Sequence, residues 1–142
     1  MGFRSVLAKP FASVVARQTA AWTGRPGHFQ QKIMTSLVQT AAETAFGKEH
    51  GFEAIRGHED FRKQIPIRDY EGFRPYIDLI KQGRSNVLWP GLPLYLSKTS
   101  GTTSGTKYIP ITRASMPNHI TSTRNALLSY IHETGRSSFI DG

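Results

Sequence analysis

One short segment restricts the possible folds of this chain more than any other feature: Thr99-Ser100-Gly101-Thr102-Thr103-Ser104-Gly105-Thr106-Lys107. Six of its nine residues carry hydroxyl groups, two are glycines and the last is a lysine. Short apolar segments flank it, Leu94 to Leu96 before it and Tyr108 to Thr112 after it. Alternation of apolar and polar residues, as at Ile109 and Ile111, is typical of a half-buried strand. We therefore expect a strand, a polar loop and a second strand.

The composition of this loop suits the binding of a polyphosphate. Glycine permits positive φ and close approach of the backbone, so that successive N–H groups can converge on one anion. Hydroxyl groups donate further hydrogen bonds without bulk and can reach a metal ion that is bound to the phosphates. A lysine ammonium adds a compact positive charge. The loop is therefore a candidate cradle for a chain of phosphates.

Two better-known loop motifs do not fit this spacing. A Walker A loop has four residues between its first glycine and a Gly-Lys pair, whereas three residues separate Gly101 from Gly105 and Thr106 precedes Lys107. The order Gly-Thr-Thr-Ser-Gly also differs from the Gly-x-Ser-x-Gly turn of serine hydrolases. A flexible Ser/Thr/Gly linker is the alternative interpretation of the same composition.

Two helices are expected near the start of the chain. Apolar residues at positions 7, 11, 14 and 15 indicate a first helix, with Pro10 in its first turn. The apolar pattern from Phe29 to Phe46 indicates a second helix, which Gly47 is positioned to end. Both helices are interpreted as structural.

The middle of the chain carries shorter helical signals. Asp69 is positioned to cap a helix over residues 70–73. A further helical stretch over residues 76–80 follows Pro75, and Gly83 ends it. Residues 85–93 are expected to form a loop with apolar anchors.

A last helix is expected after the second strand. Thr112 is its predicted N-cap and Gly135 its predicted end. Phe139-Ile140 is expected to begin a further strand. The predicted fold class is α/β, with residues 1–83 mainly helical and residues 84–142 holding strand, loop, strand and helix. One face of the last helix is defined by the apolar residues Met116, Ile120, Leu127 and Ile131.

Charge is distributed unevenly along the 142 residues. The sequence has 18 Lys+Arg and 10 Asp+Glu, a formal net charge of +8, and its first acidic residue is Glu43. An acid-free, Arg-containing start is typical of an organellar transit peptide. The same charge distribution is compatible with a basic surface that binds nucleic acid or anionic lipid. It is equally compatible with an ordinary helix whose basic face is exposed to solvent.

Composition excludes several classes of site. The sequence has no cysteine, which excludes disulfides, thiolate zinc sites and thiol catalysis. The five histidines form no His-Glu-x-x-His pair, so we expect no metal ligand among them. No apolar run approaches the ~18 residues of a membrane-spanning helix.

A succession of motifs resembles one protein family. The Ser/Thr-rich loop by itself is similar to the nucleotide-binding signature of the acyl-adenylating superfamily. Together the motifs resemble the auxin-responsive promoter family of acyl-acid amido synthetases, in its bacterial form, over nearly the whole chain. The motifs are residues 45–52 (Ala-Phe-Gly-Lys-Glu-His-Gly-Phe), 65–71 (Ile-Pro-Ile-Arg-Asp-Tyr-Glu), 74–77 (Arg-Pro-Tyr-Ile), 86–91 (Asn-Val-Leu-Trp-Pro-Gly) and Lys98–Gly105 running into Lys107–Pro110.

The resemblance implies a two-step reaction with ATP and Mg²⁺. Such enzymes convert a carboxylic acid into an acyl-adenylate and release pyrophosphate, and an amine, commonly an amino acid, then attacks the activated carbonyl. The resemblance implies Lys107 as the catalytic residue that supports the phosphate charge. The residues that it implies as phosphate-binding are Thr99, Ser100, Gly101, Thr102, Thr103, Ser104 and Gly105.

Members of the family are several times longer than 142 residues. The resemblance thus implies that residues 1–142 are the N-terminal part of an adenylate-forming domain, inactive by themselves. It implies a cytoplasmic enzyme whose partners are ATP, a carboxylic acid and an amine, and neither nucleic acid nor membrane. The alternative from charge is a basic module that binds nucleic acid or a membrane surface, with an affinity that falls with salt and ignores ATP.

Overall fold

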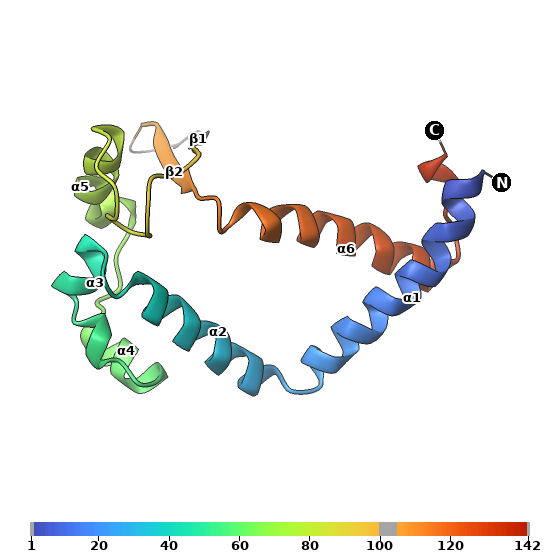
Figure 1. Ribbon diagram of the computed structural model, residues 1–142, viewed down its shortest axis with the longest axis horizontal. Coiled ribbons are helices and arrows are strands. Elements are labelled where there is room, and N and C mark those ends of the chain that lie inside the picture. The colour runs from blue at the N-terminus through green and yellow to red at the C-terminus, as the bar shows by residue number, and fades with distance from the viewer. Residues whose placement is uncertain (1, 100–104, 142) are drawn as a thin grey trace. The chain divides into compact units, whose positions relative to one another are not determined.

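The computed structural model describes residues 2–99 and 105–141. Within these ranges the chain is mostly helical, with a two-stranded antiparallel sheet (Figure 1). The predicted α/β class is confirmed at this level. The elements are α1 (Phe3–Thr23), α2 (Pro26–Ala41), α3 (Ala45–Glu49), the 3₁₀ turn η1 (Phe52–Ala54), α4 (His58–Gln64), α5 (Tyr70–Lys81), β1 (Tyr95–Thr99), β2 (Lys107–Ile111), α6 (Met116–Thr134) and the 3₁₀ turn η2 (Ser138–Ile140).

The elements belong to two compact units. Residues 1–29 and 114–142 form the first, which contains α1, α6 and η2. Residues 30–113 form the second, which contains most of α2 and every element from α3 to β2. Among the described residues, no helix is both long and apolar enough to span a bilayer.

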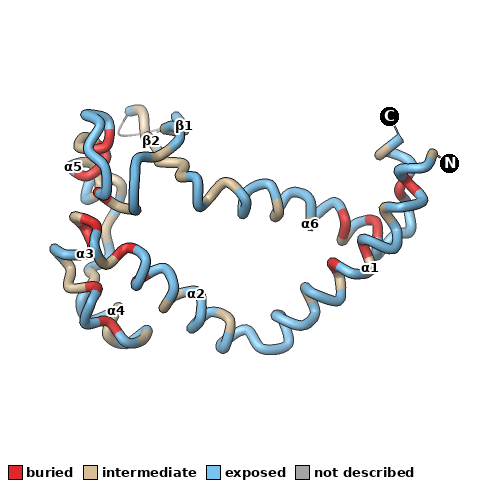
Figure 2. Tube along the Cα trace, viewed as in Figure 1, coloured by how far each residue is buried: buried red, intermediate tan, exposed pale blue. Residues whose placement is uncertain are grey.

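In the first unit, α1 packs against α6 through small side chains. Ala12 and Val15 are buried on α1, and they cluster with Leu128 and Ile131 of α6 (Figure 2). The start of α1 has no side-chain cap of its own. Instead the carboxylate of Asp141 accepts the N–H groups of Gly2 at 2.7 Å and Ser5 at 3.2 Å. Asp141, which is far from α1 in the sequence, thus accepts hydrogen bonds from N–H groups at the start of α1 that have no partner within the helix.

The structure corrects two predictions about α1. The helix begins at Phe3, so Pro10 lies inside it rather than in its first turn. At this interior position proline has no N–H to donate to a carbonyl of the preceding turn. Of the apolar residues that indicate this helix, Val15 is buried, whereas Leu7, Phe11 and Val14 are 53%, 47% and 49% exposed. The contact with α6 uses Val15 together with Ala12, whose small side chain lets the helices approach closely.

Two predictions near α6 are wrong and one is confirmed. Gly135 ends the helix with φ 67°, as predicted, but the N-cap position belongs to Ser115 and not to Thr112. On the predicted apolar face, Ile131 is buried while Ile120 is 63% exposed. Phe139-Ile140 forms the 3₁₀ turn η2 rather than a strand, and Ile140 packs against the α1–α6 cluster instead of pairing with another strand.

The core of the second unit is built around aromatic rings. Phe46 makes edge-to-face contacts with Phe52 and Tyr76, at centroid distances of 5.7 Å and 5.2 Å. Apolar residues from α5 and from the segment before β1 complete this core (Figure 2). Its buried members are Val38, Ala41, Phe46, Phe52, Ile55, Tyr76, Ile77, Ile80 and Val87.

Gly47 does not end a helix, contrary to prediction. α2 already ends at Ala41, and Gly47 lies inside α3, which Thr44 caps by accepting the N–H of Gly47 at 3.0 Å. A Cβ on Gly47 would overlap the carbonyl oxygens of Ala41 and Ala42. Glycine is required at position 47 because the backbone at the end of α2 leaves no room there for a side chain. This requirement comes from the packing of α2 against α3.

α5 is one continuous helix from Tyr70 to Lys81, where two helical segments were expected. The predicted N-cap is confirmed, because Oδ1 of Asp69 accepts the N–H of Gly72 at 3.0 Å. Pro75 lies inside the helix. The apolar residues that follow it, Ile77 and Ile80, are buried in the core, and this burial stabilises the helix across the proline.

Both strands are present, with shifted bounds. β1 runs over Tyr95–Thr99 rather than 94–96, and β2 over Lys107–Ile111 rather than 108–112. They pair antiparallel with Thr99 opposite Lys107 and Tyr95 opposite Ile111. Leu96 and Tyr108 pack against the core of the unit. This packing holds the hairpin on α5.

Candidate functional site

The ends of β1 and β2 bring the two ends of the predicted phosphate loop together. Thr99, the last residue of β1, is paired with Lys107, the first residue of β2. Gly105 has φ 78°, a left-handed conformation that favours glycine. The other predicted contacts, Ser100, Gly101, Thr102, Thr103 and Ser104, lie outside the described residues.

The side chain of Lys107 lies beside α5. Its Nζ is over the ring of Tyr70, 5.6 Å from the ring centroid. The hydroxyl of Tyr70 accepts the backbone N–H of Tyr108 at 2.8 Å. The first residue of α5 therefore contacts both of the first two residues of β2. Sequence reasoning placed Tyr70 in a motif but not in the site, since no local pattern indicates a contact across 38 residues.

An ion pair lies next to this contact. Arg74 donates to both carboxylate oxygens of Glu71, at 2.6 Å and 2.7 Å. The hydrogen bonds from Arg74 hold the pKa of Glu71 below its usual range, and the positive charge of Lys107 lowers it further. The guanidinium of Arg74 also lies over the Tyr70 ring, at 5.7 Å. Glu71 is thus a neighbouring carboxylate whose charge is already matched by a cation.

A second ion pair on α5 faces the same strand. Nζ of Lys81 is 3.2 Å from Asp78 and lies over the ring of Tyr108, 5.2 Å from its centroid. Arg74 and Lys81 are thus paired with Glu71 and Asp78, and Lys107 adds a further positive charge beside Tyr70. Such a surface favours an anionic ligand at the open end of the hairpin.

A polar network lies on the other side of the same helix. Arg68 contacts Nε2 of His50 at 2.6 Å and the hydroxyl of Tyr76 at 3.3 Å. That hydroxyl donates to Glu49 at 2.8 Å. Burial, together with the hydrogen bond to Glu49, raises the pKa of Tyr76. These groups satisfy one another's hydrogen bonds, so we assign the network to stability.

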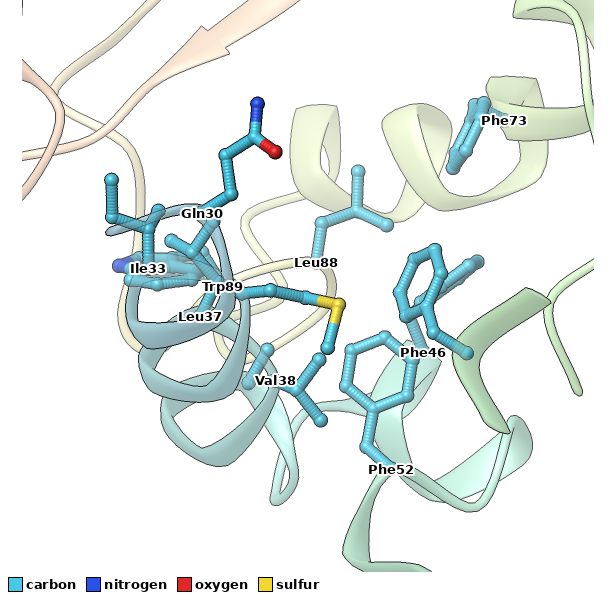
Figure 3. A pocket seen from close by; sticks show the side chains of 12 residues that line it. Gln30, Ile33, Leu37, Val38, Phe46, Phe52, Phe73, Leu88 and Trp89 are labelled. Carbon is cyan, nitrogen blue, oxygen red and sulfur yellow. The ribbon is translucent and has the colours of Figure 1, made fainter. Parts of the chain in front are cut away.

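The second unit also contains an apolar pocket of about 530 Å³. The Phe46 and Phe52 rings lie side by side in its wall, and Gln30 supplies an amide at its edge (Figure 3). Such a pocket can take up apolar groups but carries no acid, base or nucleophile. The remaining lining residues are Ile33, Met34, Leu37, Val38, Ala41, Phe61, Phe73, Leu88 and Trp89.

No carboxylate and histidine side chains gather as a metal centre in the described parts of the chain. Within residues 2–99 and 105–141 there is no group of three or more His, Asp or Glu residues that could hold an ion. Glu71 and Asp78 of α5 are each already paired with a cation. A divalent ion near the hairpin would therefore depend on phosphate and hydroxyl oxygens.

The chain is similar to proteins of one family. The GH3 family N-terminal domain matches residues 15–138, a range that contains Tyr70, Thr99 and Lys107. The indole-3-acetic acid-amido synthetase GH3.15 of Arabidopsis thaliana is 32% identical over 114 residues, which cover 76% of this chain and 18% of that protein. The chain therefore spans less than a fifth of the length of this relative.

Proposed function

Because this chain belongs to the GH3 family, we propose that it is the N-terminal, ATP-phosphate-binding segment of an acyl-acid amido synthetase. The family is the auxin-responsive promoter family that the sequence motifs resemble, and this part of the prediction is confirmed. The bacterial form of the family remains a prediction. The relative of known activity is named as an indole-3-acetic acid-amido synthetase, which supports an amide-forming ligase.

The observation that carries the proposal is the register of the hairpin. Pairing of Thr99 with Lys107 closes the loop at its base, and Nζ of Lys107 lies over the ring of Tyr70. The base of the loop thus adjoins two cations, Lys107 and Arg74, which both lie over the Tyr70 ring. This arrangement suits an extended polyanion such as a triphosphate.

In the proposed reaction a carboxylate oxygen attacks the α-phosphorus of ATP, and the bond to pyrophosphate breaks. The resulting acyl-adenylate is attacked by an amine, which forms the amide and releases AMP. Loop N–H groups, the hydroxyls of residues 99–104 and the ammonium of Lys107 stabilise the charge on the departing pyrophosphate. Mg²⁺ bound to ATP would neutralise part of the phosphate charge, and the hydroxyl-rich loop fits such an ion better than the ion-paired carboxylates do.

The acyl and amine pockets are not assigned to this chain. It spans 18% of the relative that it matches, so we propose that the 142-residue chain by itself does not catalyse adenylation. ATP–pyrophosphate exchange driven by a carboxylic acid and the isolated chain would contradict this part of the proposal.

Binding of MgATP to the ¹⁵N-labelled chain, followed by NMR, tests the proposed phosphate site. Removal of the charge-assisted contact in Lys107→Ala is expected to weaken binding ~10- to 100-fold. Gly101→Val is expected to weaken it as well, because a branched side chain restricts the loop. The matched control is Lys48→Ala, which removes an exposed lysine paired with Glu43 at 2.8 Å and is expected to change affinity less than ~2-fold.

Equal MgATP affinity in Lys107→Ala and Lys48→Ala would overturn the assignment of the site. So would the absence of MgATP binding by the folded chain. Binding to nucleic acid or anionic vesicles that falls with salt and ignores ATP would instead favour the alternative of a basic binding module.

A further inference from the structure

We propose that Tyr70 is a positioning residue for Lys107, which it places at the exit of the loop for contact with a polyphosphate. This inference rests on the proposed function, because Lys107 matters only if the loop binds ATP. Neither the motif that contains Tyr70 nor the partial burial of its side chain requires such a role. Three contacts carry it.

The first contact fixes the strand. In a two-stranded sheet, each strand directs half of its N–H groups away from its partner, and such edge donors need another acceptor. The N–H of Tyr108 finds one in the hydroxyl of Tyr70, at 2.8 Å. Since Asp69 caps the same turn of α5 through Gly72, the beginning of β2 is tied to the beginning of a capped helix.

The second contact fixes the cation. A lysine ammonium sits on a flexible four-carbon stem and has no preferred direction of its own. The ring of Tyr70 presents its negative face to Nζ of Lys107, 5.6 Å from the centroid. Cation–π attraction favours this placement over the other rotamers.

The third contact keeps the ammonium available for a phosphate. Glu71, the next residue, would otherwise be a strong competitor for Lys107. Both of its carboxylate oxygens accept from Arg74, whose guanidinium lies over the Tyr70 ring as well. Two cations thus lie over the Tyr70 ring: Arg74, which is bonded to Glu71, and Lys107, the first residue of β2.

A double-mutant cycle on MgATP affinity separates positioning from a general contribution to folding. Tyr70→Leu is expected to raise the Kd of the 142-residue chain ~3- to 5-fold, which corresponds to the loss of the cation–π contact. In a Lys107→Ala background the same substitution is expected to change the Kd less than ~2-fold, because Tyr70 acts through Lys107. The control is Tyr76→Phe, which removes a hydroxyl from the same helix that bonds Arg68 and Glu49 and is expected to leave the Kd unchanged.

Equal effects of Tyr70→Leu in the two backgrounds would overturn the inference while leaving the proposed function intact. Failure of the wild-type chain to bind MgATP would overturn both. Tyr70→Phe keeps the ring but loses the hydroxyl that accepts the N–H of Tyr108, so it is expected to raise the Kd less than Tyr70→Leu does. A loss as large as that of Tyr70→Leu would show that the ring does not position the lysine.

The chemical shift of Lys107 provides a measurement that needs neither ligand nor a destabilised variant. Protons over an aromatic face are shielded, so the Hε protons of Lys107 are expected upfield of those of the exposed Lys48. The signal is assigned by its absence in Lys107→Ala. Upfield Hε protons in the wild type and in Tyr70→Phe support the placement, and a Lys107 signal at the position of Lys48 would overturn it.

Discussion

Truncation of Ile77 in α5 should strongly destabilise the unit that carries the candidate site. Ile77 is 4% exposed and belongs to the core cluster. Replacing it with alanine removes three carbons, which at about 0.8 kcal/mol each gives about 2.4 kcal/mol of lost transfer free energy. The cavity left in a close-packed core adds to this value, and the higher helix propensity of alanine offsets a few tenths. We expect Ile77→Ala to lower the free energy of unfolding by about 3 kcal/mol.

The chain supplies a control of the same residue type. Ile67 lies in the segment before α5 and is 104% exposed, so Ile67→Ala is expected to change the unfolding free energy by less than about 0.5 kcal/mol. Ile77→Val removes one methylene and is expected to cost about 1 kcal/mol.

Urea unfolding read by the fluorescence of Trp89 measures these changes in the second unit. A Trp22→Phe background leaves Trp89 as the remaining one of the two tryptophans in the sequence. Changes in the transition midpoint at constant slope give the difference in free energy. A cost below about 1 kcal/mol for Ile77→Ala, or equal costs at positions 67 and 77, would refute the described packing of α5.

Two further predictions concern single contacts. Gly47→Ala should destabilise the second unit by about 1–3 kcal/mol, because a Cβ would overlap the carbonyl oxygens of Ala41 and Ala42; Trp89 fluorescence during urea unfolding measures this, and a neutral effect would contradict the close approach. Hydrogen bonds from Gly2 and Ser5 hold the pKa of Asp141 below its ordinary value of 3.8. The stability that Asp141 contributes is therefore complete above pH 3.8 and lost as the pH falls through its lower folded value. In thermal unfolding read by Trp22 in a Trp89→Phe background, the difference between wild type and Asp141→Ala should shrink as the pH falls from ~5 to ~2, and a constant difference would exclude the cap.

Some local features follow from nearby residues alone. Asp69 caps α5 and Gly135 ends α6 as predicted, because a cap depends on groups within one turn of the chain. The strands on either side of the loop were also predicted, since their apolar alternation is local. Their bounds differ by a few residues because the pairing of Thr99 with Lys107 extends β1 toward the loop.

Other features could not be predicted from local patterns. Gly47 has the position of a helix stop in the sequence, but its role is set by the carbonyl groups of α2 that pass over it. Proline was expected to divide α5, and the helix continues across Pro75 because its apolar residues are buried in a shared core. Of the four apolar residues that indicated α1, Val15 is buried and the other three are exposed, and the contact with α6 uses Val15 together with Ala12.

For the candidate site, the sequence by itself predicts the chemistry, and the tertiary structure decided the geometry. The hydroxyls, glycines and lysine of residues 99–107 indicate a phosphate loop, and the surrounding motifs indicate its family, because composition and order are properties of the chain. The placement of Lys107 over Tyr70 joins residues far apart in the sequence. It depends on how the hairpin packs against α5, and no pattern within either segment contains that information.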